Sequence, residues 1–248
     1  MVLNVLGSSS KGNCYLLEAS DGILILEAGI PAVEVKKAIG YQIDKVVGCV
    51  VSHKHGDHSK FVKDIISCGI KVLALDDVFS SHGITNRAFC KTIEPMHGYR
   101  IGRFNVYTIP VAHDVPCLGF VIEHEEMGRM LFITDTMMLE YVIPNLDHIM
   151  LEANYCDRIL QENIDKGIVP VTMRDRLLHS HMELNTAKNI IKANDITNVK
   201  EIILVHLSDN NSNGGFFKQE MAKASGKPVY IASKGLELNL WQYETDTE

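Results

Sequence analysis

The residues best suited to chemistry lie close together in the first quarter of the chain. His53, His55 and His58 stand with Asp57 in a span of six residues, directly after the apolar run Val46–Val51. Imidazole and carboxylate suit zinc and related metals, and alternating ligands from one loop can reach two neighbouring ions. The pattern therefore predicts a metal site on a loop at the end of a buried strand; the alternative is a solvated polar loop.

Three later polar residues also end strand-like runs: His113, Asp135 and His206. Taken alone, each histidine would be a structural residue and the aspartate a helix cap. Strand ends at one edge of a sheet converge, so we expect these three side chains to join the first cluster. Their joint placement indicates further metal ligands.

The elements that must position these residues follow from the apolar patterning. The predicted strands are Val2–Leu6, Cys14–Glu18, Ile23–Glu27, Val46–Val51, Val72–Leu75, Phe104–Ile109, Leu118–Ile122, Met130–Thr134, His148–Leu151, Glu201–Val205 and Val229–Ala232. Four helices are predicted. The first begins at Pro31 and has Val33, Val35, Ala38 and Ile39 on its apolar side, and the second runs through Ile65 and Ile66. The other two cover roughly Glu183–Ala193 and Phe216–Ala224. Sheets covered by helices are expected, while periodicity leaves the topology open.

Composition describes a water-soluble globular protein. The chain has 248 residues, 46% of them hydrophobic and 22% charged, without repeats or linkers, which favours one domain. No apolar run approaches the roughly 20 residues of a membrane span, and the first residues resemble a strand more than a signal peptide. We therefore expect a cytoplasmic protein with no membrane partner, either a monomer or a homodimer.

Cysteines and net charge narrow the possibilities further. The six cysteines include no C-x-x-C pair, so a disulfide framework is not expected. The net charge is -7, which provides no general basic surface for nucleic acid. A phosphate-bearing substrate would need a local positive site, such as bound metal.

The order His-x-His-x-Asp-His, then a lone His, a lone Asp and a last His, resembles the metallo-β-lactamase superfamily over nearly the whole chain. The resemblance implies an α+β fold: a four-layer αββα sandwich of two mixed sheets flanked by helices, formed as a single domain by residues 1–248. It also implies two divalent metal ions, with zinc expected and manganese or iron as alternatives. One ion would be bound by His53, His55 and His113, the other by Asp57, His58 and His206, with Asp135 bridging.

In the best-known lactamases a cysteine contributes to the second metal, where this chain has Asp135, which favours the hydrolase and phosphodiesterase branches. Finer motifs resemble the YycJ/VicX group, which is associated with metal-dependent DNA exonuclease activity and whose relatives often carry a phosphoribosyl cyclic phosphodiesterase label. These motifs are Gly7–Tyr15, Val111–Phe120, Leu151–Asn154, Arg174–His181 and His206–Asn211.

The chain departs from the family pattern at three places. Glu27 stands where the family commonly has the Asp of an Asp-x-Gly turn that orients metal ligands. Asn154-Tyr155-Cys156 replaces the group's Asn-His-Asp, and Ser180–Leu184 replaces Gly-His-Leu-Ser-Asn. The resemblance therefore specifies metal binding more closely than it specifies the substrate.

The predicted function is phosphodiester hydrolysis by a metal-bridged hydroxide, with DNA ends as the preferred substrate. Asp57 would bind metal and orient the nucleophile, and the resemblance makes His181 the proton donor; the alternative is a surface histidine beside His179. Candidate substrate contacts are Ser9, Ser10 and Asn13 in a glycine-flanked loop, and Asn210 and Asn211 after the last ligand, although plain turns would explain both segments. The alternatives are a phosphodiesterase of cyclic nucleotides or cyclic sugar phosphates, a glyoxalase II-like thioester hydrolase, and a metal-binding protein without catalysis.

Overall fold

Two seven-stranded sheets face each other in the computed structural model, which describes residues 1–241. The first sheet has the order β14 (Glu237–Asn239), β1 (Val2–Gly7), β2 (Cys14–Ala19), β3 (Gly22–Leu26), β4 (Val46–Val50), β5 (Val72–Ala74) and β6 (Cys90–Thr92). The second has the order β13 (Val229–Ile231), β12 (Glu201–Val205), β11 (His148–Glu152), β10 (Gly128–Ile133), β9 (Cys117–His124), β8 (Phe104–Val111) and β7 (Gly98–Ile101). Both sheets mix antiparallel and parallel pairs.

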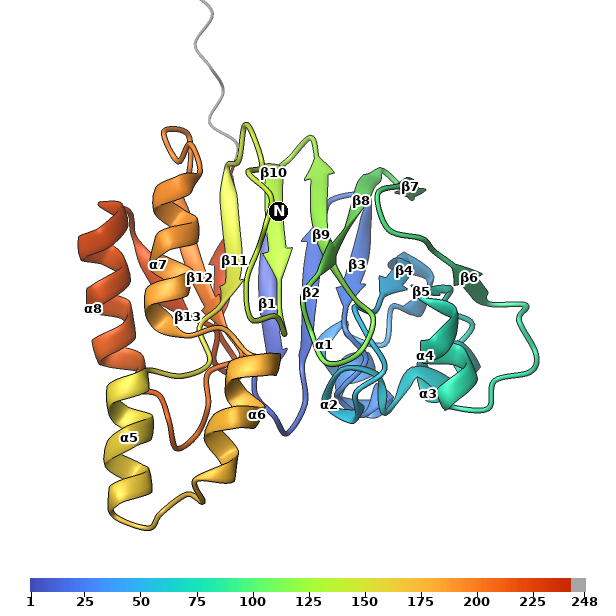
Figure 1. The fold of residues 1–248 in the computed structure, drawn as a ribbon. Helices are drawn as coiled ribbons and strands as arrows, with labels where there is room; N and C mark the ends of the chain where they lie inside the picture. Colours follow the sequence, from blue (N-terminus) through green and yellow to red (C-terminus); the bar gives the residue numbers. More distant parts are fainter. Residues whose placement is uncertain (242–248) are drawn as a thin grey trace, which may run out of the picture.

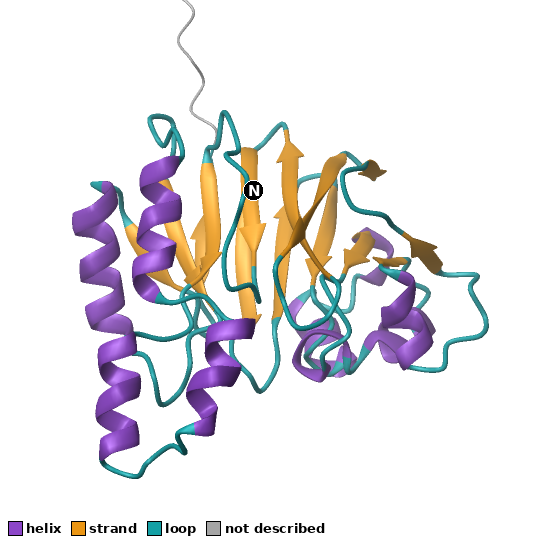
Figure 2. Ribbon diagram, viewed as in Figure 1, coloured by secondary structure: helices purple, strands orange, loops and turns teal. Residues whose placement is uncertain are grey.

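Helices cover the outer faces of both sheets (Figures 1 and 2). Beside the first sheet lie α1 (Ala32–Ala38), the 3-10 turn η1 (Ile43–Lys45), α2 (Gly56–Ser59), α3 (Val62–Ser67) and α4 (Asp76–Ser81). After the central strands of the second sheet come α5 (Asp157–Asp165), α6 (Thr172–Ser180), α7 (Leu184–Ala193) and α8 (Gly214–Ser225). The expected four-layer αββα sandwich of two mixed sheets is confirmed.

Three apolar layers stabilise the sandwich. They form because successive side chains of a strand point to opposite faces of its sheet. In β2, Leu17 packs in the layer between the two sheets, whereas its neighbour Leu16 packs toward α1 and α3. The inner layer also contains Phe120 and Phe132 of the second sheet, whose outer face packs against α7 and α8. Because both faces of the central strands are buried, their sequences are nearly continuous apolar runs.

The predicted strands and long helices all form, with ends shifted by one or two residues. The patterning missed the short edge strands β6, β7 and β14 and the helices α4, α5 and α6. It was wrong about Val33, which is 50% exposed, and about Ala38, which is also exposed, although both were assigned to the apolar side of their helix. All six cysteines are free, and no helix in the described range is long and apolar enough to cross a membrane.

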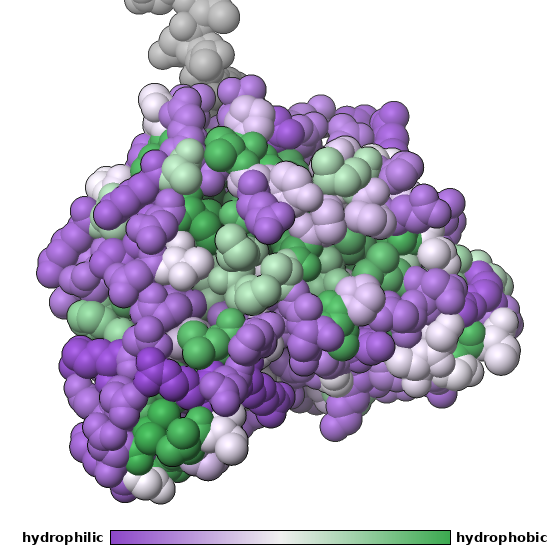
Figure 3. Space-filling view, viewed as in Figure 1, coloured by the Kyte–Doolittle hydropathy of each residue, from purple (hydrophilic) through white to green (hydrophobic). Residues whose placement is uncertain are grey.

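The pair α5 and α6 extends beyond the sheets, at the lower end of the molecule in Figure 1. It packs around its own small apolar cluster of Tyr155, Leu160, Val169 and Leu177. Figure 3 shows an apolar area at the lower end of this pair, and the segment that joins the helices carries the exposed side chain of Ile168. This pair therefore forms an arm beside the sandwich, and not a further layer of it.

Candidate metal centre

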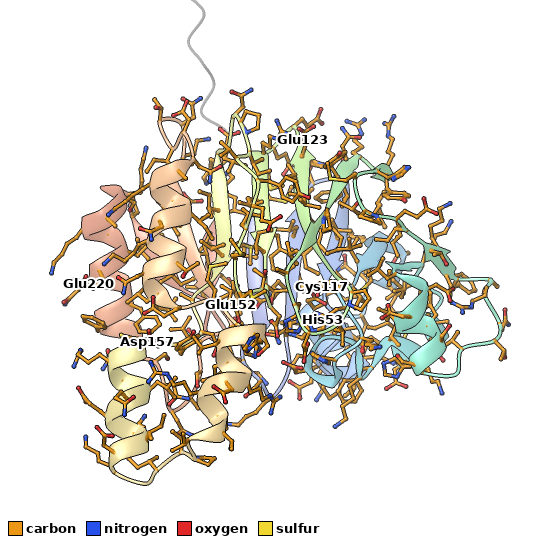
Figure 4. All side chains as sticks on the ribbon, viewed as in Figure 1. His53, Cys117, Glu123, Glu152, Asp157 and Glu220 are labelled. Carbon is orange, nitrogen blue, oxygen red and sulfur yellow. The ribbon has the colours of Figure 1, made fainter. Side chains whose placement is uncertain are left out.

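Strand direction brings the predicted ligands to one edge of the sandwich. Strands β8, β10, β11 and β12 all run the same way, and His113, Asp135, Glu152 and His206 lie at or just beyond their carboxyl ends. The loop that contains His53 follows β4 of the opposite sheet. Figure 4 shows the labelled His53 and Glu152 near each other at the lower ends of the strands.

Ligand atoms form three sets at this edge, each with all of its atoms within 4.8 Å of one another and each including Asp135. One set combines Asp135 with Glu152, His181 and His206, and the other two combine it with the predicted ligands. Of these two, the first set is His53, His55, His113 and Asp135; the second is Asp57, His58, Asp135 and His206. Both match the grouping that the resemblance implied. Histidine nitrogens and carboxylate oxygens of this number suit two divalent ions with a bridging carboxylate.

The buried polar atoms of the first set fit a metal. His53 is fully buried, and its Nε2 has no hydrogen-bond partner among residues 1–241, while its Nδ1 lies 2.9 Å from Ser52 Oγ. Burial and the neighbouring His58 hold the pKa of His53 well below its usual value. The ring is therefore neutral and has a free lone pair, as a metal ligand requires.

The second set combines histidines with carboxylates at close range. His58 Nε2 lies 3.1 Å from Asp135 Oδ1, and His206 Nε2 lies 3.1 Å from Asp57 Oδ2. Burial disfavours the charged form of both rings, but the nearby Asp135 carboxylate outweighs this effect. It raises the pKa of His58 well above the usual value for histidine, and it raises the pKa of His206 to about 10. Burial also opposes ionisation of Asp135 and Asp57, but the facing histidines lower the pKa of both carboxyls.

Two of the ligand histidines, His113 and His206, are each held by a hydrogen bond from Nδ1 to an oxygen. His113 Nδ1 donates to the backbone carbonyl of Ser180 at 2.7 Å, and His206 Nδ1 donates to Glu152 Oε1 at 3.1 Å. These bonds fix the ring so that Nε2 faces the ligand set. Glu27 takes the expected orienting position, since its Oε2 lies 3.6 Å from His58 Nδ1.

His181 lies beside the second set and is paired with a buried carboxylate. Its Nδ1 donates to Glu152 Oε1 at 2.7 Å and lies 3.7 Å from Asp135 Oδ2. Burial opposes the charged form, but Glu152 outweighs it and raises the pKa of His181. The sequence included Glu152 only within a motif. The sequence signal that could have identified Glu152 as a site residue is an acidic side chain at the end of the otherwise apolar strand β11.

Two connected hollows open at the metal centre. One, of about 270 Å³, is lined by ligand residues and by His181; the other, also about 270 Å³, lies toward α5 and α6. Both are lined by Ser10, Arg176, His181 and His206. They are therefore adjoining parts of one cleft. A larger hollow, of about 660 Å³, lies elsewhere, near Arg100 and Glu123, and is lined by none of the predicted site residues.

The predicted substrate residues fall into two groups. Ser10, Asn210 and Asn211 line the cleft. Asn13 does not: it is fully buried, and its backbone N–H donates to the carbonyl of Asp57 at 2.8 Å while its side chain lies 3.0 Å from His58 Nε2. Ser9 is not among the lining residues either, and its Oγ accepts the backbone N–H of Lys11 at 3.2 Å. These two residues shape the loops beside the ligands.

Comparison with known proteins agrees with this geometry. Residues 9–99 match the Metallo-beta-lactamase superfamily. Exodeoxyribonuclease YycJ from Bacillus anthracis is 26% identical over 249 residues, which cover 94% of this chain and 89% of that protein.

Solved structures share the fold over nearly the whole chain. The metallo-beta-lactamase fold protein YhfI from Bacillus subtilis has a TM-score of 0.74 at 19% identity and covers 96% of this chain and 98% of its own. A diphosphatase of the PhnP family has a TM-score of 0.68 at 14% identity, with 96% of both chains covered. Human tRNase Z, short form, has a TM-score of 0.63 at 14% identity and covers 97% of this chain and 99% of its own. Together, these findings show that the chain has the metallo-β-lactamase fold, matches that superfamily in sequence over residues 9–99, and places clustered histidine and carboxylate side chains that could hold metal at one edge of the fold.

Proposed function

We propose that the chain hydrolyses phosphodiesters at DNA ends. The observation that carries the proposal is the pair of ligand sets sharing Asp135, with His181 held by Glu152 at their border. The chain is similar to an exodeoxyribonuclease over nearly its whole length, which supports DNA as the substrate. It also shares its fold with a diphosphatase and with tRNase Z, which is consistent with phosphate ester chemistry.

The ligand sets would hold two divalent ions, zinc in our expectation, with manganese or iron as alternatives. When bound, such ions lower the pKa of a coordinated water and neutralise charge on the phosphate. The side chain of Asp57 is 20% exposed and lines the cleft, where its carboxylate can orient the attacking water. His206 and His58 hold the Asp57 Oδ2 from the protein side, at 3.1 Å and 3.3 Å.

His181 is placed to protonate the leaving oxygen. Its Nδ1–H is directed at Glu152, so its Nε2–H is the group available to the cleft that His181 lines. Glu152 does not line either hollow and acts through His181, as a positioning residue. This arrangement suits an alkoxide leaving group, which departs poorly without a proton.

The test compares two leaving groups. We expect His181→Ala to slow cleavage of end-labelled DNA by about 10²- to 10⁴-fold, and hydrolysis of bis(p-nitrophenyl) phosphate far less, because p-nitrophenolate leaves without a proton. Asp57→Ala should abolish both reactions. His179→Ala is the matched control, since His179 is exposed and, among residues 1–241, its side chain is hydrogen-bonded only to the carbonyl of Asp175. Equal losses on both substrates in His181→Ala would contradict the donor role.

A small cyclic phosphodiester is the second candidate substrate. The net charge of -7 and the small volume of the cleft favour it. Turnover of a cyclic nucleotide that is insensitive to salt, with DNA left intact, would decide for this alternative.

A further inference from the structure

We propose that the hollow between the metal centre and the arm α5–α6 binds one unpaired nucleoside, while Arg176 binds the phosphate attached to it. The proposal rests on phosphodiester hydrolysis as the proposed function and specifies the substrate group that the site selects. The shared chemistry is a nucleobase and sugar next to a phosphate, supplied by a DNA end or by a small nucleotide.

The walls of this hollow match a nucleobase. The lining combines the apolar side chains of Val169, Met173, Leu177 and Leu207 with the amides of Asn154, Asn210 and Asn211. A flat heterocycle has apolar faces and a polar edge, so it needs this combination of surfaces. The amide of Asn154 donates to the carbonyl of His206 at 2.8 Å, while its Oδ1 has no hydrogen-bond partner within residues 1–241.

Arg176 lies where the nucleoside hollow meets the metal centre. Its side chain is exposed, lines both hollows, and makes no ion pair within the described residues. The contrast on the same helix is Arg174, whose guanidinium donates to Gln161 Oε1 at 2.5 Å and faces Asp157 at 4.0 Å. A free guanidinium at this border suits a phosphate oxygen, which it can bind through two parallel hydrogen bonds.

The hollow is built without help from metal. Asn163 of α5 donates to the carbonyl of Asn210 at 2.8 Å and to Asn211 Oδ1 at 3.3 Å. The backbone N–H of Cys156 donates to the carbonyl of Asn211 at 3.0 Å, and that of Ser208 donates to the carbonyl of Asn154 at 2.9 Å. These bonds join the arm to the loop after β12. The nucleoside site should therefore exist in the metal-free protein.

The size of the hollow restricts its occupant to a single nucleoside. At about 270 Å³ it lies just below the range of roughly 300–1000 Å³ that is usual for ligand pockets. A base that enters so small a hollow must leave its partner strand. DNA ends that are single-stranded or frayed should therefore be preferred to paired ends.

The first test uses two chromogenic esters that share the p-nitrophenolate leaving group. We expect the p-nitrophenyl ester of thymidine 5′-phosphate to be hydrolysed with a kcat/KM at least about tenfold above that of bis(p-nitrophenyl) phosphate. Met173→Trp fills the apolar side and should remove most of this preference. Leu178→Trp is the matched control on the same helix, since Leu178 is 40% exposed and does not line the hollow. The exposed Asn210 provides a second variant, Asn210→Ala, which should weaken the preference without disturbing the core.

The second test measures equilibrium binding to the metal-free protein by calorimetry. Thymidine 5′-monophosphate should bind more tightly than deoxyribose 5-phosphate. Met173→Trp should abolish the difference, whereas Arg176→Met should weaken both ligands alike. Equal binding of the two ligands to the wild type would overturn the nucleoside site.

The outcomes separate this inference from the proposed function. Hydrolysis of both esters at equal kcat/KM would overturn the nucleoside site and leave the phosphodiesterase standing. If both esters are inert, the proposed function fails, and selective binding of thymidine 5′-monophosphate would still support the site. Comparing a single-stranded oligonucleotide with a cyclic nucleotide then identifies the source of the nucleoside.

Discussion

Replacing Glu152 with glutamine tests how the metal centre is organised. Oε2 of Glu152 accepts the backbone N–H groups of Thr136 and Met182, both at 3.0 Å. Oε1 accepts Nδ1–H from His181 at 2.7 Å and from His206 at 3.1 Å. A glutamine has one oxygen, so if it keeps the backbone bonds its NH₂ group meets two ring N–H donors.

Two measurable losses follow. Hydrogen bonds to a charged acceptor contribute about 1.5–3 kcal/mol each, and relief of a buried carboxylate offsets part of the loss, so we expect a destabilisation of about 2 kcal/mol. For a chain of this size that lowers the Tm by about 4–8 °C. His206 also loses the partner that directs its Nε2 toward the ligand set, which should weaken metal binding about 10- to 100-fold.

Thermal unfolding and metal titration against a chelator measure these losses, and the protein offers a matched control. Glu201 accepts Nδ1–H of buried His148 at 2.6 Å, at the opposite ends of the same two strands. Glu201→Gln should lower the Tm without changing metal affinity. If Glu152→Gln binds metal as tightly as the wild type, Glu152 does not orient the ligands and the reasoning fails.

Two further substitutions test the loops around the ligands. Gly29→Ala should abolish metal binding, because the added Cβ would lie 1.8 Å from the carbonyl oxygen of Asp57. Gly56→Ala is the control within the metal loop, since its Cβ would have nothing within 4 Å. Equal metal affinity in both variants would refute the steric argument. Glu27→Gln should reduce metal affinity about 10- to 100-fold by removing the negative charge behind His58, as measured by chelator competition, and an unchanged affinity would show that Glu27 has no orienting role.

Strand-end placement was predictable from the sequence because each ligand follows an apolar run long enough to be a buried strand. The sequence predicted that His113, Asp135 and His206 would meet the first cluster, and the structure brings their side chains into the two ligand sets. The role of Glu152, in contrast, was not predictable from the sequence. Its importance comes from the sheet order β10-β11-β12, which places it between Asp135 and His206, and periodicity does not determine sheet order.

The arm α5–α6 and the burial of Asn13 depend on long-range packing that the sequence does not display. Helix α6 has a buried side of few residues, among them Leu177, and polar residues occupy most of the rest, so its apolar pattern is weak. Asn13 looked like a substrate contact because it follows a glycine in a polar loop. The loop instead packs on the metal loop, where the backbone of Asn13 binds Asp57.

Salt dependence distinguishes an enzyme that binds a DNA end from one that binds along a duplex. The chain has a net charge of -7, and two lysines near the cleft, unlike Arg176, are paired: Lys11 lies 2.7 Å from Asp209, and Lys54 lies 3.6 Å from Asp77. This leaves the scissile phosphate and the phosphate bound by Arg176 as the contacts that release counterions.

For single strands, the logarithm of the binding constant falls by about 0.7 per phosphate for each tenfold rise in salt. One or two phosphates then predict that affinity for a single-stranded oligonucleotide falls only about three- to sevenfold between roughly 50 and 200 mM salt. A protein with 6–10 phosphate contacts along a duplex, where the slope is about 0.9 per phosphate, would lose about 10³- to 10⁵-fold over the same range. Fluorescence anisotropy with a labelled oligonucleotide measures the slope, and Arg176→Met should reduce it by about 0.7. A steep slope in the wild type would mean that a basic surface outside this cleft binds the DNA, and the end-binding geometry argued from Arg176 would be wrong.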